Sequence, residues 1–388
     1  MGWRWPLLAA LGGAGAYGVS AALSQRPELA ERWYGSGMGP ALSRPLSLLT
    51  GLVPFSVGDV VLGAYATWLV VVTVLTLRSL VRRRRSLRNA AGGGLRRVMR
   101  DGGLAVLLLY VLWGWHYATP GFEAGAGWPE WEEATTAELI ALAEAATAAA
   151  NRAYVDLHGS ADTGRPTAFS DGGADVAEAL SEGWVQAAGH LGLPRRFGAR
   201  YGRVKRPYAS VILVRLGVQG TYFPFTAEAN VVRGLPAAGA LSSMGHEQAH
   251  QRGITSEAEA SFLGFVATAL APARLGRYNA AVWAHGQLGN ALVRADRRAW
   301  ARISATRLPG VTRDLRDLAA FLSRPSLIGR RVGALVNDRY LRANRVPGGR
   351  QNYALSARLL IEYARQHEGT LFPDPEREAF RSRPRGAR

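Results

Sequence analysis

Long uncharged runs dominate the first third of the chain, and shorter apolar segments with helical spacing follow them. A helix needs ~20 residues to cross the hydrocarbon core of a bilayer. The runs therefore predict membrane spans at about residues 5–25, 60–78 and 102–119. A cleaved signal peptide is the alternative for the first run, but the run continues without a clear small-residue cleavage site.

The arginines between the runs predict how the spans are oriented. Residues 78–100 hold nine arginines and no acid, whereas residues 25–58 hold three arginines and two glutamates. Since arginine-rich loops stay in the cytoplasm, we expect residues 25–58 and everything after about residue 122 on the extracytoplasmic side of the cell membrane. Residues 45–58 are apolar but too short to span, which predicts an interfacial or re-entrant segment.

Residues 123–372 have the composition of a soluble domain in which helical periodicity prevails. Thr135 and Glu138 form a capping box at the start of its first helix. β-branched and aromatic residues predict strands at 209–217 and 221–232. Helices are expected at about 135–156, 174–191, 256–272, 276–294, 296–305, 312–322, 327–341 and 350–367.

The predicted fold class is therefore α+β. Three N-terminal transmembrane helices, in residues 1–122, precede a mainly helical extracytoplasmic domain with a small sheet, residues 123–372. Residues 373–388 mix Arg, Pro and Gly, which predicts a disordered basic tail.

The formal charge of +18 does not indicate nucleic-acid binding. Of the 47 basic residues only Lys205 is a lysine, a skew typical of a coding bias towards arginine, and the arginines are scattered rather than gathered in one patch. The one dense run, residues 82–85, is explained by membrane orientation. Because the chain has no cysteine, any metal would have to be held by His, Asp or Glu.

Residues 245–262, GHEQAHQRGITSEAEASF, contain the candidate chemistry. His246 and His250 are four residues apart and share one face of a helix, so their imidazoles can converge on one ion. Glu247 lies beside His246, where it can take a proton without being a ligand. This is the HExxH arrangement of zinc hydrolases, in which Zn²⁺ activates a water and polarises the substrate carbonyl and Glu247 would be the general base.

A third protein ligand is expected on the next helix. Gly253 can end the first helix, and Thr255 or Ser256 can cap a second one whose first turn reaches the metal. Glu257 is the preferred ligand and Glu259 the alternative. They stand ~200° apart on a helix, so only one can point at the ion.

A solvated helix end with incidental histidines is the competing interpretation of this motif. The acidic second helix at short spacing disfavours it, and the sequence offers no Gly-x-Ser-x-Gly elbow and no glycine-rich phosphate loop between a strand and a helix. The other histidines stand singly, which is typical of core or surface positions: His116, His158, His190, His285 and His367.

Five segments together resemble an uncharacterised bacterial family of multi-pass membrane proteins, a domain of unknown function with a zincin-like HExxH motif. They begin at Leu52 (LVPFSVGD), Trp113 (WGWHYATP), Tyr222 (YFPFTAEAN), His246 (HEQAHQRGITSEAEASF) and Val336 (VNDRYLRAN). The resemblance covers most of the chain. It implies a membrane-anchored zinc metallopeptidase of the gluzincin type and names no substrate.

The gluzincin likeness bears on two further positions. In gluzincins an Asp or Asn four residues after the ligand glutamate braces a histidine; here that position is Ser261, a departure, although a hydroxyl can still hold the ring. Zincin-like folds also place an edge strand beside the active-site helix, where a peptide adds by β-pairing. Tyr222 and Asn230 are the candidate substrate-binding residues, and a buried aromatic strand without that role is the alternative.

A metallopeptidase is the preferred function, with a peptide or protein substrate and the lipid bilayer as partners and no nucleic acid. A catalytically silent membrane scaffold is the runner-up, disfavoured by the intact Glu247. An intramembrane protease is disfavoured because the residues around the motif, 238–253, are polar. The sequence does not determine the oligomeric state.

Overall fold

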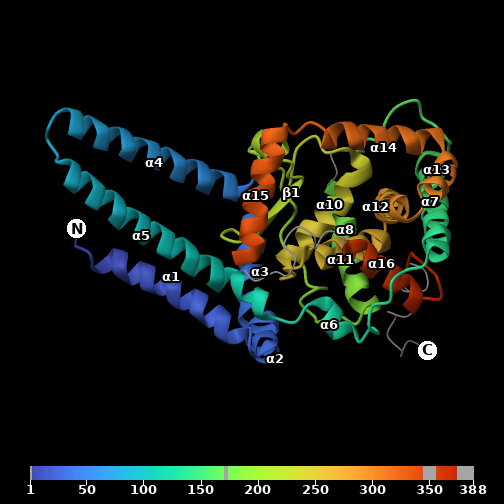
Figure 1. Cartoon of the computed structure of the whole chain (residues 1–388), viewed down its shortest axis with the longest axis horizontal. Helices are drawn as coiled ribbons and strands as arrows, with labels where there is room; N and C mark the ends of the chain where they lie inside the picture. The colour runs from blue at the N-terminus through green and yellow to red at the C-terminus, as the bar shows by residue number, and fades with distance from the viewer. Residues whose placement is uncertain (1, 170–173, 344–354, 374–388) are drawn as a thin grey trace. The chain divides into compact units, whose positions relative to one another are not determined.

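The computed structural model describes residues 2–169, 174–343 and 355–373, which are mostly helical and include one two-stranded sheet (Figure 1). The chain divides into two compact units. The N-terminal unit is Met1–Pro120 with Phe223–Glu228, and the C-terminal unit is Gly121–Tyr222 with Ala229–Arg388. The predicted tail, 373–388, lies from residue 374 onwards outside the described residues.

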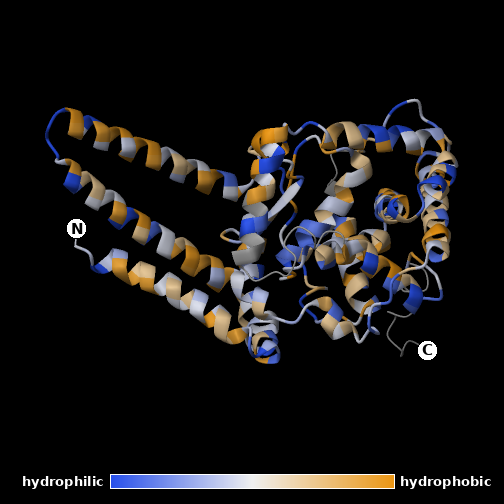
Figure 2. Ribbon diagram, viewed as in Figure 1, coloured by the Kyte–Doolittle hydropathy of each residue, from blue (hydrophilic) through white to orange (hydrophobic). Residues whose placement is uncertain are grey.

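The N-terminal unit is a set of helices. In chain order they are α1 (Arg4–Leu23), α2 (Pro27–Ala30), the π-helix η1 (Glu31–Met38), α3 (Gly39–Gly51), α4 (Val57–Val81), α5 (Leu87–Leu112) and the 3₁₀-helix η2 (Gly114–Ala118). Two of the described helices, α1 and α4, are long and apolar enough to cross a membrane. Hydrophobic residues run along the whole length of α4 in Figure 2.

The prediction of a third span at 102–119 is wrong by the criteria of helix length and apolar composition. The helix there, α5, begins at Leu87 within the arginine-rich segment and ends at Leu112. Its uncharged part covers only residues 102–112, well short of the ~20 residues that a span requires. The apolar run continues to residue 119, but the backbone leaves the α-helix at Trp113.

Helix α5 nevertheless lies alongside α1. A Cβ on Gly103 would overlap the backbone of Ala9, and one on Gly13 would lie 2.7 Å from the carbonyl oxygen of Gly103. The guanidinium of Arg96 stacks 5.3 Å from the ring centre of Trp3. The arginines of α5 therefore lie near the end at which α1 begins, close to the turn between α4 and α5 in Figure 1.

Residues 45–58, predicted to be interfacial or re-entrant, form the second half of α3 and the turn before α4. The start of α4 is capped by a buried carboxylate: Glu228 accepts hydrogen bonds from the backbone N–H groups of Val57 (3.0 Å) and Gly58 (2.8 Å) and from the hydroxyl of Thr226 (2.8 Å). A negative charge is favourable at this end of the helix dipole. Thr226 in turn accepts a bond from the hydroxyl of Thr50 through its carbonyl oxygen.

The C-terminal unit contains the remaining elements. They are α6 (Phe122–Ala126), α7 (Thr136–His158), α8 (Ala174–His190), α9 (Ser210–Arg215), β1 (Gly220–Phe223), β2 (Glu228–Val231), α10 (Ala237–Gln251), α11 (Glu257–Leu270), α12 (Arg274–Ala295), α13 (Arg297–Ala305), α14 (Pro309–Leu322), α15 (Leu327–Ala343) and α16 (Leu355–Gln366). The tip residues of the β1–β2 hairpin belong to the N-terminal unit.

Helix α11 is the centre of the C-terminal unit. Every residue of α11 except Ser261 is buried, and α8, α10, α12 and α16 pack around it. Glycines allow the closest approaches. A Cβ on Gly264 would lie 2.6 Å from the backbone carbon of Gly245 on α10, and one on Gly183 of α8 would overlap the carbonyl oxygen of Ala267. The helices around the motif are therefore fixed by backbone contact.

Two strand predictions require correction. Residues 209–217 contain no strand but the short helix α9 (Ser210–Arg215). Gly217, two residues after the helix, adopts a left-handed backbone conformation (φ +79°). Its β-branched residues favour a strand only where a partner strand is at hand, and β2 pairs instead with β1 and, by a single bridge, with Lys205. The predicted strand at 221–232 is two strands joined by a tight turn.

Candidate metal centre

Helix α10 presents His246 and His250 on the same face. Their Nε2 atoms lie 3.1 Å apart, and the side chains are largely withdrawn from solvent. The helix ends at Gln251, and Gly253 turns the chain back with φ +95°, a conformation that favours glycine. The second helix therefore starts close to the histidines.

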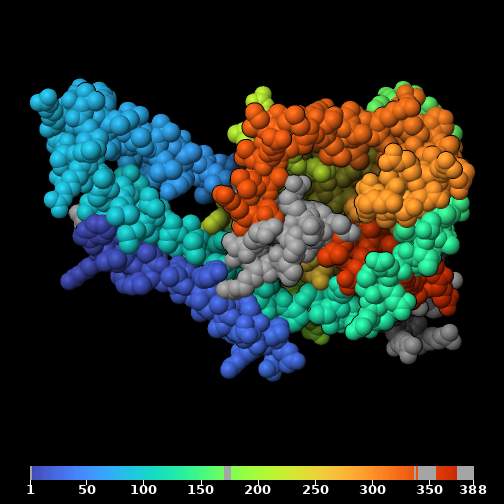
Figure 3. Space-filling view, viewed as in Figure 1, coloured from blue at the N-terminus to red at the C-terminus, as the bar shows by residue number. Residues whose placement is uncertain are grey.

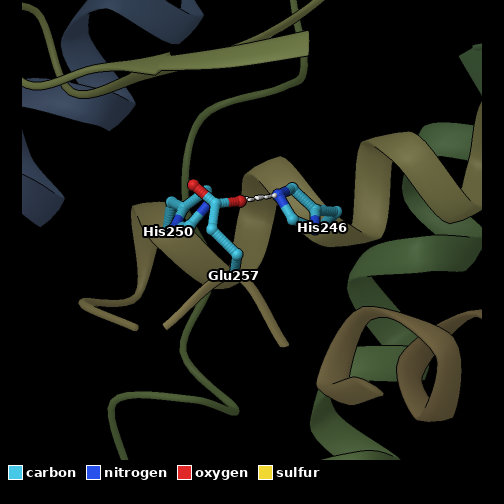
Figure 4. A group of neighbouring side chains, drawn as sticks. All are labelled: His246, His250 and Glu257. Atoms are coloured by element: carbon cyan, nitrogen blue, oxygen red, sulfur yellow. Dashed lines mark hydrogen bonds and ion pairs between the residues drawn. The ribbon is translucent and has the colours of Figure 1, made fainter. Parts of the chain in front are cut away.

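Helix α11 supplies the third group from its first residue. Ser256 caps the helix by accepting a hydrogen bond from the N–H of Glu259. Glu257 Oε2 lies 3.2 Å from His246 Nε2 and 3.6 Å from His250 Nε2. Figure 4 shows the carboxylate directed at the two rings.

The outer nitrogen of each histidine is held by a protein oxygen. His250 Nδ1 donates to the carbonyl oxygen of Ile254 (2.7 Å), so this nitrogen carries the proton. His246 Nδ1 lies 3.0 Å from the hydroxyl of Ser261. Partners of this kind fix the orientation of metal-binding imidazoles and turn Nε2 towards the ion.

The three donor atoms fit a zinc ion. Tetrahedral zinc with ligands at about 2.0–2.2 Å separates neighbouring ligand atoms by roughly 3.3 Å. The His246, His250 and Glu257 donors lie within 4.8 Å of one another, with individual separations of 3.1, 3.2 and 3.6 Å. Two nitrogens and one oxygen form a donor set that suits zinc.

The charges of the cluster shift the pKa values of its members. Burial alone would lower the pKa of His250, but the hydrogen bond and the charge of Glu257 raise it to about 9. Burial alone would raise the pKa of Glu257, but the hydrogen bonds from the two histidines hold it well below its usual range. The cluster therefore keeps Glu257 ionised, and its negative charge favours a positive charge beside it.

Glu247 lies outside the donor cluster. It is buried, and its carboxylate accepts a hydrogen bond from the backbone N–H of Tyr222 in β1. Gly220 lies directly against it, because a Cβ there would come within 2.5 Å of Glu247 Oε1. Burial raises the pKa of Glu247 to about 7. The β1 backbone thus holds this carboxylate from the side opposite to its helix.

Glu259 is buried in a different place. Its Oε1 accepts a hydrogen bond from the N–H of Glu123 (3.1 Å), and the N–H of Phe122 also donates to it. Gly121 leaves room for the carboxylate. Burial raises its pKa to about 7. The structure therefore brings Glu257, and not Glu259, to the histidines, while Glu259 fastens the start of α6.

The two candidate substrate-binding residues lie on the hairpin. The N–H of Tyr222 is used by Glu247, and its side chain is buried. Asn230 in β2 donates from its side chain to the carbonyl oxygen of Thr221 (3.3 Å) and is also buried. Neither belongs to the donor cluster.

Two contributors were missed by sequence reasoning. Ile254 acts through its backbone carbonyl, which no side-chain pattern signals. Gly220 is the first residue of β1. A glycine in a strand is typical of close backbone approach, but this signal is not specific to a functional site.

A family model described as "Protein of unknown function (DUF3810)" matches residues 34–361 of the chain. No curated protein matches it significantly, and no solved structure does either.

Proposed function

Because the chain belongs to the DUF3810 family, whose function is unknown, its activity has to be inferred from its own residues, and we propose that it is a membrane-anchored, zinc-dependent metallopeptidase. His246, His250 and Glu257 hold the zinc ion, and Glu247 is the general base. The substrate is a peptide or a protein.

One observation carries the proposal: three donors converge from two helices, while a second carboxylate, that of Glu247, is held apart from them. A structural metal site would need no such extra group. Glu247 is buried, adjacent in sequence to a ligand and bonded to the β1 backbone. A carboxylate that is kept close to the ion without binding it is typical of a general base in metal-assisted hydrolysis.

The zinc ion and the side chains would contribute different parts of the hydrolysis. When bound, zinc supplies Lewis acidity towards a carbonyl and makes a water nucleophilic near neutral pH. Glu247 takes the proton of the attacking water and passes it to the leaving amine. The N–H of Tyr222 and the close backbone of Gly220 orient that carboxylate. Ser261 and Ile254 orient the imidazoles.

Membrane anchoring is the second part of the proposal. Helices α1 and α4 have the length and composition of spans, and α5 returns the chain alongside α1. The nine arginines of residues 78–100 keep the turn between α4 and α5 in the cytoplasm. An extracytoplasmic C-terminal unit would need a third crossing, and α5 does not have the apolar length to supply one by itself.

Substrate binding by Tyr222 and Asn230 remains a prediction. The N–H of Tyr222 is already committed to Glu247, so β-pairing with a peptide would have to use other groups of β1. The aromatic ring would contribute by contact.

The test compares the wild-type chain with Glu247→Gln, both purified in detergent. We expect stoichiometric zinc in both proteins, and hydrolysis of labelled casein or autolysis in the wild type only, with a loss of about 100-fold or more in the variant. Zinc in both proteins with no cleavage by either would favour the silent scaffold. Equal cleavage by both would remove Glu247 from the mechanism.

A further inference from the structure

Two elements of the C-terminal unit, α9 and α15, expose apolar side chains to an unusual degree. On α9, Val211 is 65% and Ile212 63% exposed. On α15, Leu327 is 70% and Ile328 75% exposed, and Val332 and Leu335 are also open to solvent. Single exposed apolar residues need no explanation, but a group of six on two adjoining elements indicates an interaction surface.

The two elements are in direct contact. Gly329 and Gly333 of α15 lie against the carbonyl oxygens of Arg215 and Leu216, and a Cβ at either glycine would overlap them. The glycine side of α15 therefore packs on the end of α9, and the opposite side faces outwards. Figure 3 shows α15 in orange on the surface of the molecule.

The outward side of α15 has the pattern of an interfacial helix. On a helical projection Leu327, Ile328, Val332 and Leu335 fall within an arc of about 140°, with Arg331 inside the same arc. Apolar residues interspersed with arginines, whose long side chains reach past the apolar layer, are typical of helices that lie in a membrane surface.

Charge favours lipid over a protein partner. Exposed arginines accompany the apolar residues, namely Arg215, Arg330, Arg331 and Arg339. None of the four forms an ion pair with any residue that the structure describes. Asp338 is the one acid in α15, so the arginines leave a net positive charge beside the apolar surface, which complements anionic headgroups.

We propose that Val211, Ile212, Leu327, Ile328, Val332 and Leu335, hereafter the α9–α15 patch, dock on an anionic bilayer surface, with the arginines binding lipid headgroups. The inference rests on the proposed membrane anchoring. A chain held by α1 and α4 has a high effective concentration at its own bilayer, so a weak surface contact suffices.

The absence of cysteine makes the test direct, since each introduced cysteine is the only one in the chain. Full-length Ile212→Cys and Leu335→Cys, labelled with an environment-sensitive dye, are placed in nanodiscs at one chain per disc. Brominated lipids should quench both labels, more strongly with phosphatidylglycerol than with phosphatidylcholine alone. Val71→Cys on α4 reports membrane insertion, and the equally exposed Val185→Cys on α8 should stay unquenched.

The outcomes separate this inference from the anchoring on which it rests. Quenching at position 71 without quenching at 212 and 335 overturns the docking and leaves the anchoring intact. No quenching at any of the three overturns both. A shift at 212 or 335 that requires two chains per disc, and does not depend on lipid, assigns the patch to a second copy and also overturns the proposal.

The charge can be tested separately. Arg330→Gln with Arg331→Gln should weaken the preference for phosphatidylglycerol by up to about fivefold per arginine. The matched pair Arg297→Gln with Arg298→Gln, exposed on α13, should leave it unchanged. An undiminished preference in the first pair would contradict the role of the arginines.

Discussion

At the scale of single residues, the candidate site depends on where each donor atom points. His246→Ala and His250→Ala should each abolish stoichiometric zinc, because each removes one of three ligands. Glu247→Gln should retain the ion, since that side chain lies outside the cluster. Metal analysis of the purified variants checks this, and comparable zinc loss in all three would contradict the assigned roles.

The two glutamates of α11 should not be interchangeable. Glu257→Ala should lower zinc affinity by orders of magnitude, whereas Glu259→Ala should keep the metal and lower stability by ~1–3 kcal/mol, because two buried N–H groups lose their acceptor. Zinc titration and thermal unfolding of both variants separate the effects. Zinc loss in Glu259→Ala without a change in stability would contradict the position of its carboxylate.

Sequence reasoning reached most of the donor cluster because HExxH spacing follows from helix geometry alone. The gluzincin likeness also pointed to position 261 as the place of a residue that holds a histidine, although Ser261 departs from the Asp or Asn of that pattern. It left Glu257 and Glu259 as alternatives, since the choice depends on where α6 starts, far away in the chain. The contact between Gly220 and Glu247 is equally long-range and invisible in a local pattern.

At the scale of elements, the crossing of α10 and α11 controls the site. Gly264→Ala should destabilise the protein by ~1–3 kcal/mol, since its Cβ meets backbone rather than a movable side chain. It should also weaken zinc binding, because α11 carries Glu257. Thermal unfolding and zinc titration test both effects.

The matched control for that substitution is Gly286→Ala on α12, where an added Cβ meets nothing within 4 Å. It should be neutral or stabilise by up to about 1 kcal/mol through helix propensity. If Gly264→Ala behaved like Gly286→Ala, close packing would not be what positions the ligand.

His285 joins α12 to α7 and makes stability depend on pH. Thr147 donates its hydroxyl proton to Ala143, so His285 Nδ1 donates to Thr147 as a neutral ring. Burial lowers the pKa of His285 to about 4. Between pH 6.5, the ordinary pKa of a histidine in the unfolded chain, and about pH 4, the unfolded chain therefore binds more protons than the folded one. The free energy of unfolding should fall as the pH falls through that window.

The size of that loss should be on the order of 2 kcal/mol. His285→Gln, which cannot titrate, should show a shallower dependence of its unfolding free energy on pH over the same window. An unchanged slope in the variant would assign the acid sensitivity to other groups.

Element prediction failed where local preference and tertiary context disagree. Residues 209–217 carry a strand-like composition, yet they form α9, because β2 is paired on both sides by other segments. The helix predictions succeeded because apolar spacing and capping residues indicate the same helices. For example, the Thr135 hydroxyl accepts a hydrogen bond from the N–H of Glu138, as the capping box predicts. The carboxylate of Glu138 also pairs with Arg365, more than two hundred residues away, which no local pattern could indicate.

At the scale of the whole molecule, the proposed orientation can be tested with reporter fusions. A fusion after residue 40 should be active on the extracytoplasmic side and a fusion after residue 90 on the cytoplasmic side. The arginine asymmetry between the two loops motivates this expectation. A cytoplasmic reporter at position 40 or an extracytoplasmic one at position 90 would contradict it, and a third fusion after residue 200 decides whether α5 brings the chain back across.

The burial of α11 limits local unfolding at the candidate metal centre. Local opening is confined to segments with few buried contacts, and helices buried all round open only when their whole unit unfolds. Since α11 is enclosed on every side, its first turn cannot fray independently of the core. The geometry around Glu257 is therefore as rigid as the C-terminal unit is stable, and any sequence change that softens that core loosens the ligand sphere in proportion.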